Sequence, residues 1–203
     1  MLKILFAFAL LSVFGPAAAE VVVKDDTGAT LRLPQPAQRI ITLAPHMAET
    51  LFAAGAGSKL VGTVEYSDYP EEVKKIPRVG GYSRFDLEAV IALKPDLVIA
   101  WYSGNAPAHV EKLRSLGFPI YVSQPNSIED VAAELERFGV LAGTSEIGNA
   151  AAARLRERFA GLQKRYSQRP VVRTFYQIWK QPLTTIGGKQ IISSIVRLCG
   201  GEN

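Results

Sequence analysis

The chain has 203 residues, of which 48% are hydrophobic and 21% are charged. These proportions are ordinary for a globular protein, and they exclude a chain too polar to bury a core. The formal net charge is +4, and it falls to +3 without Lys3, the one charged residue among the first 19. No basic run with interleaved aromatic residues occurs, and the arginines within 154–158 indicate a solvated helix face. A nucleic-acid partner is therefore not expected.

Residues 1–19 predict a cleaved secretory signal peptide. Lys3 supplies a positive start, residues 4–14 form an apolar stretch too short to span a bilayer, and Ala17-Ala18-Ala19 provides a small-residue cleavage site before Glu20. The alternative is an uncleaved anchor, which the small residues at the junction and the lack of a second apolar stretch disfavour. No cysteine lies near the cleavage site, so lipid modification there is disfavoured too. We expect an exported, freely soluble protein.

Strands and helices are predicted to alternate after a first hairpin, residues 21–33, whose turn is Asp26-Thr27-Gly28. Alternation of this kind implies a parallel sheet with helices on both faces, an α/β lobe that we assign to residues 20–144. Residues 126–129 provide a plausible cap for the last helix of this lobe. The expected strands are 39–43, 60–64, 96–100 and 119–122, and the expected helices are 46–54, 87–93, 106–116 and 127–141.

A long helix is predicted from Ser145 to about Ser167, because this stretch has no proline and many strong helix formers. At 1.5 Å per residue it would be about 35 Å long, enough to join two lobes. We therefore assign 145–168 to an inter-lobe backbone helix and 169–203 to the beginning of a second α/β lobe. That second unit offers a β run from Val171 and a short helix ending at Leu198. It is smaller than an autonomous domain, so we expect a fragment lacking most of its second lobe.

Aromatic residues follow three short apolar runs. Residues 96–100 run into Trp101, residues 171–178 into Trp179, and residues 60–65 into Tyr66. The carboxyl ends of parallel strands line the crevice where ligands bind, so these rings would form flat apolar walls around a large ligand. The alternative is that each ring closes the rim of a core. The pattern favours a receptor over an enzyme.

Other features offer little chemistry. Gly187-Gly188-Lys189 resembles the end of a phosphate loop, but Gln190 replaces the Ser or Thr that would hold magnesium. No G-x-S-x-G serine elbow occurs. His46 faces the proposed crevice, either as a polar helix-start residue or as a ligand to a bound metal centre, and His109 is expected on a helix surface. Cys199 is the single cysteine, so it cannot form an intramolecular disulfide, and we expect a buried, inert thiol.

Five segments carry a family resemblance. Together they resemble the periplasmic vitamin B12-binding proteins of ABC importers and, more broadly, the helical-backbone binding proteins that also serve ferric siderophores and haem. The resemblance implies two α/β lobes joined by one rigid helix, the class III periplasmic-binding fold, with its C-terminal lobe incomplete here. The segments are 39–45 (RIITLAP), 49–55 (ETLFAAG), 66–70 (YSDYP), 87–101 (LEAVIALKPDLVIAW) and 198–203 (LCGGEN).

The resemblance also implies site residues. Tyr66 and Trp101 match aromatic residues that contact the corrin ligand, Tyr82 lies where a familiar cobalamin binder has tryptophan, and Trp179 lies close to an aromatic residue of the second lobe. Glu88 matches an acid that docks onto arginines of the permease, although it could be an ordinary acid at a helix N-terminus. The smaller ring of Tyr82 leaves the identity of the ligand open.

The implied function is capture of cobalamin, or a related corrinoid, between the lobes and delivery to an ABC permease. The implied protein is a periplasmic monomer that performs no chemistry and needs no cofactor and no resident metal. The near alternative is a haem or ferric siderophore carrier of the same superfamily. The distant alternative is an exported α/β enzyme whose acid, base and nucleophile would converge in the crevice.

Overall fold

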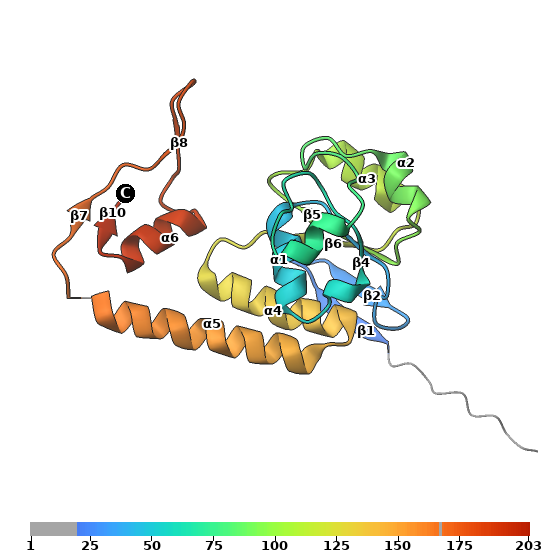
Figure 1. Cartoon of the computed structure of the whole chain (residues 1–203), viewed down its shortest axis with the longest axis horizontal. Coiled ribbons are helices and arrows are strands. Elements are labelled where there is room, and N and C mark those ends of the chain that lie inside the picture. Colours follow the sequence, from blue (N-terminus) through green and yellow to red (C-terminus); the bar gives the residue numbers. More distant parts are fainter. Residues whose placement is uncertain (1–19, 167) are drawn as a thin grey trace, which may run out of the picture.

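The computed structural model describes residues 20–166 and 168–203, so the expected signal peptide lies outside the described residues. An α/β lobe lies at one end of a long helix, and a smaller C-terminal unit lies at the other end (Figure 1). Within the described ranges, no helix combines the length and apolarity needed to cross a membrane.

The lobe is built on four parallel strands in the order β4-β3-β5-β6, which confirms the predicted parallel sheet. Their side chains alternate between two buried clusters, one on each face. Helices α1 and α4 contribute to the first cluster and α2 and α3 to the second, so helices cover both faces as expected. The strands are β3 (Ile40–Thr42), β4 (Leu60–Gly62), β5 (Leu97–Trp101) and β6 (Ile120–Ser123), and the helices are α1 (Pro45–Ala53), α2 (Leu87–Ala92), α3 (Pro107–Ser115) and α4 (Ile128–Ala142).

Local signals explain where these elements begin and end. Ser127 caps α4, and its hydroxyl and the Asp130 carboxylate form a reciprocal capping box. Gly143 ends α4 in the left-handed conformation at φ 69°. The predicted hairpin is confirmed as antiparallel β1 (Val21–Lys24) and β2 (Thr30–Leu33). Two short 3-10 helices, Gly57–Lys59 and Glu71–Lys75, lie in segments where no helix was expected.

The long helix is confirmed as α5 (Ser145–Tyr166), and its N-terminal half packs closely on α4. Small residues permit this approach, because a Cβ at Gly148 would lie 2.5 Å from the Leu135 carbonyl oxygen. Ala151 and Ala152 continue the buried stripe. From 159 to 166, every side chain is half-buried or exposed, and this last part of α5 reaches toward the C-terminal unit.

The C-terminal unit corrects two expectations. The single β run predicted from Val171 is split, because β7 (Val172–Arg173) pairs in parallel with β10 (Gly201–Glu202), whereas β8 (Gln177–Trp179) forms a hairpin with β9 (Thr184–Thr185). Between these pairs lies α6 (Ile191–Leu198), the predicted short helix. Cys199 is exposed rather than buried, because it is the C-cap residue and lies just beyond α6.

Candidate ligand-binding site

A cleft opens between the carboxyl ends of the sheet strands and the start of α6. It holds a cavity of about 360 Å³, formed by both the lobe and the C-terminal unit. This is the position in which parallel α/β sheets bind ligands. The cavity is lined by residues of α1, of the segments that follow β5 and β6, of α4 and of the start of α6: His46, Glu49, Thr50, Trp101, Ser103, Gln124, Pro125, Val131, Glu134, Gln190 and Ile191.

Trp101 is the centre of an aromatic cluster at this cleft. It is the last residue of β5 and is partly buried. Its ring centroid lies 5.2 Å from that of His46, with the rings edge to face at 81°, and 5.8 Å from that of Tyr82. The indole lies on Gly104, where an added Cβ would come within 1.9 Å of the ring. A side chain at 104 would therefore displace the indole, which explains a glycine there.

Asn105 fixes this cluster through its buried amide, which is 5% exposed. The backbone N–H of Trp101 donates to Asn105 Oδ1 at 2.6 Å. The Asn105 Nδ2 group donates to the carbonyl of Leu43, which follows β3, at 2.8 Å and to the carbonyl of Tyr82 at 2.6 Å. One side chain thus joins the ends of two strands to the loop that carries Tyr82. Sequence reasoning missed this residue.

The other two predicted aromatic residues lie in exposed positions. Tyr66 follows β4, its side chain is 76% exposed, and its backbone is left-handed at φ 64°. A bulky residue rarely adopts this conformation, and such outliers gather at functional sites. Trp179 is 65% exposed in the β8–β9 hairpin, so the expectation that it ends a parallel strand is wrong. Residues 177–179 pair with 184–185 in this hairpin and do not join the four-stranded sheet.

The two histidines differ in their surroundings. His46 faces the cleft as predicted, and burial lowers its pKa, so its imidazole is neutral near pH 7. His109 is not a simple surface residue, because it is half-buried with its ring 5.4 Å from that of Phe85. Helix α3 thus places this ring against Phe85, a member of the second buried cluster. Within the described ranges, no group of three or more His, Cys, Asp or Glu side chains could hold a metal ion.

A buried acid on the floor of the cleft also escaped sequence reasoning. Glu134 is 1% exposed, accepts a hydrogen bond from the Ser123 hydroxyl, and lines the cavity. Burial raises its pKa to about 7, although the Ser123 hydrogen bond and Arg137 oppose this. The sequence contains a signal for this buried acid, because Glu134 lies three residues after Val131, on the apolar face of α4 that continues to Leu135 and Phe138. A polar residue on such a stripe is informative.

Glu88, the predicted docking residue, lies in the first turn of α2, and its side chain is exposed. Its N–H donates to the carboxylate of Asp86, which caps the helix. This position favours an acid because of the helix dipole. It also leaves the carboxylate open to a partner.

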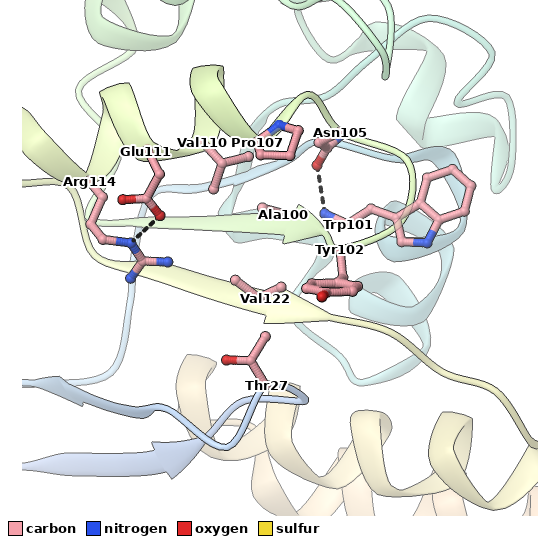
Figure 2. Close-up of a pocket in the computed structure, with 10 residues that line it drawn as sticks. All are labelled: Thr27, Ala100, Trp101, Tyr102, Asn105, Pro107, Val110, Glu111, Arg114 and Val122. Atoms are coloured by element: carbon pink, nitrogen blue, oxygen red, sulfur yellow. Dashed lines mark hydrogen bonds and ion pairs between the residues drawn. The ribbon is translucent and has the colours of Figure 1, made fainter.

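A second cavity, of about 530 Å³, lies on the far side of the Trp101 backbone, between α3 and the β1–β2 turn. Figure 2 shows the Glu111–Arg114 ion pair at one end of it and the Trp101 indole at the other. Val110 and Val122 form part of its apolar wall, and Thr27 closes it from the hairpin turn.

Residues 40–203 match the family described as "Periplasmic binding protein". The chain belongs to the periplasmic binding protein family. It is 43% identical over 168 residues to a "Vitamin B12-binding protein" of Vibrio campbellii, an alignment that covers 83% of this chain and 61% of that protein. The family assignment agrees with the resemblance seen in the sequence.

Solved structures of periplasmic binding proteins share this fold. The periplasmic vitamin B12 binding protein BtuF of Vibrio cholerae matches with a TM-score of 0.78 and 41% identity, over 83% of this chain and 66% of that one. The periplasmic heme-binding protein RhuT from Roseiflexus sp. RS-1 matches with a TM-score of 0.72 and 24% identity, over 82% of this chain and 65% of that one, which supports the fold alone. The chain thus spans about 61 to 66% of the length of these relatives.

Proposed function

We propose that this chain captures cobalamin, or a related corrinoid, in the cleft between its lobe and its C-terminal unit. The observation that carries the proposal is the 41 to 43% identity to proteins named for vitamin B12 binding. The aromatic cluster of Trp101, Tyr82 and His46 at the cleft supports it. Flat rings provide the contact area that a broad, planar ligand needs, and a few polar groups fix its orientation.

Capture would be followed by delivery to an ABC permease, without chemistry on the ligand. In this proposal the mature protein acts as a monomer in the periplasm after removal of residues 1–19. Tyr66, Tyr82, Trp101 and Trp179 contact the ligand. The exposed Glu88 carboxylate docks onto the permease, where a surface acid contributes more to orientation than to affinity.

Titration calorimetry of the chain with cyanocobalamin, haem and a ferric siderophore tests the proposal. We expect a saturable heat signal with cyanocobalamin and weaker binding of the other two ligands. Tight haem or siderophore binding without a corrinoid signal would replace the corrinoid assignment with the other carriers of the superfamily. In that case the neutral His46 imidazole in the cleft would be the first candidate ligand for haem iron.

A further inference from the structure

The floor of the cleft carries a polar pair that the aromatic cluster does not explain. Ser123 is the last residue of β6 and is 0% exposed, and Glu134 lies on α4 and is 1% exposed. The Ser123 hydroxyl donates to Glu134 Oε1. Glu134 lines the same cavity as Trp101 and His46, so its carboxyl group is within reach of a molecule in the cleft.

Within residues 20–166 and 168–203, no ion pair joins the Glu134 carboxyl group to a cation. Arg137, three residues along α4, donates instead to Asp26 in the β1–β2 turn at 2.6 Å. Among the described residues, the Ser123 hydroxyl is the one hydrogen-bond donor to the Glu134 carboxyl group, and it reaches only one of the two carboxyl oxygens. An isolated buried carboxylate is unfavourable unless a donor satisfies it.

The other charged groups around Glu134 do not provide that donor. Asp130 on α4 and Asp26 carry negative charge and favour the protonated acid. Glu49 on α1 lines the same cavity and is also acidic. His46, on the same wall, is kept neutral by burial, which lowers its pKa. The Tyr121 phenol on β6 is uncharged, because burial raises its pKa.

We propose that Ser123 and Glu134 form a subsite that accepts a hydrogen bond from a neutral amide donor at the ligand edge and excludes an ionised carboxylate from that position. The inference rests on the proposed function and adds a basis for selectivity. Corrinoids carry peripheral primary amides, whereas haem carries ionised propionates. An amide N–H satisfies the buried carboxyl oxygen, whereas a ligand carboxylate would place two negative charges in contact whenever Glu134 is ionised.

The test compares cyanocobalamin with the full set of its monocarboxylic acids, in which one peripheral amide at a time is hydrolysed. Calorimetric Kd values are measured from about pH 6 to about pH 8. The fraction of protonated Glu134 falls from about 0.9 to about 0.1 over this range if its pKa is near 7. For at least one of the acids, we expect the ratio of its Kd to that of cyanocobalamin to rise about tenfold over this range.

Glu134→Gln keeps an acceptor but removes the charge, so we expect this ratio to become independent of pH. Glu157→Gln, on the exposed face of α5, makes the same chemical change outside the cleft and should keep the wild-type slope. His46→Asn should also keep the slope, whatever its effect on affinity. If Glu134→Gln does not fold, Ser123→Ala provides the test, because loss of the hydroxyl donor should move the midpoint of the ratio to higher pH.

Three results are distinguishable. Wild-type protein that binds cyanocobalamin, but with a pH-independent ratio for every acid, overturns the subsite and leaves the proposed function intact. Wild-type protein that binds no cyanocobalamin overturns the proposed function. A pH slope that persists in Glu134→Gln would assign the selectivity to another group and refute the subsite.

Discussion

Replacing Asn105 with alanine should lower both folding stability and ligand affinity. The substitution removes three hydrogen bonds, with donor–acceptor distances of 2.6, 2.8 and 2.6 Å. At about 1 kcal/mol net for each bond, we expect the free energy of unfolding to fall by about 3 kcal/mol. The Leu43 carbonyl accounts for the largest share, because it is left buried without a donor, whereas the Tyr82 carbonyl lies in a more exposed residue.

Urea unfolding followed by circular dichroism measures this loss, and calorimetry with cyanocobalamin measures the effect on the site. Affinity should fall because the backbones of Trp101 and Tyr82 lose their common anchor. Asn149→Ala is the matched control, since Asn149 is exposed on α5 and alanine favours a helix. An Asn105→Ala protein whose stability lies within about 0.5 kcal/mol of wild type would show that these bonds do not hold the strand ends together.

Further predictions concern individual cleft residues. Trp101→Ala should weaken cyanocobalamin binding by about 1 to 3 kcal/mol in calorimetry, whereas unchanged affinity with lower stability would assign the ring to the core. Tyr66→Gly should weaken binding while thermal stability stays constant or rises by up to about 1 kcal/mol, because glycine tolerates the left-handed backbone; a clear loss of stability would contradict this. Burial raises the pKa of Glu134 from 4.5 to about 7, so its contribution to stability is full below pH 4.5 and is lost as the pH rises through 7. The stability of Glu134→Gln relative to wild type should thus increase by about 3 kcal/mol between about pH 4 and about pH 8 in urea unfolding, and a constant difference would refute the shift.

Much of the lobe could be predicted because its signals are local. Ser127 and Gly143 mark the ends of α4 within a few residues of sequence, and the apolar runs of the parallel strands alternate regularly with amphipathic helices. Trp101 could be placed at the cleft because it follows an apolar run that predicts a buried parallel strand, and ligands bind at the carboxyl ends of such strands. The long helix was evident from its composition.

The rest depends on contacts between distant residues. Asn105 bonds to a carbonyl 62 residues away, and no pattern around Asn105 indicates that partner. The split of the expected run from Val171 depends on pairing with Gly201–Glu202 on one side and Thr184–Thr185 on the other, which β propensity alone does not specify. The residue type of Cys199 predicts a buried side chain, but its position beyond α6 makes the side chain exposed.

The unequal support of α5 has a mechanical consequence. Gly148, Ala151 and Ala152 pack the first half of α5 closely on α4. Arg156 extends this support through ion pairs with Glu129 and Glu136 of α4, whereas the last two turns of α5 lie beyond it. About 10 residues separate Arg156 from Tyr166, an unsupported length of about 15 Å. A bend of about 5° at Arg156 would move the C-terminal end of α5 by roughly 1 Å, comparable to the small helix displacements that switch other proteins. Gln190 and Ile191 line the cleft and would move with the C-terminal end of α5. A slight bend of this helix would therefore widen or narrow the opening of the cleft.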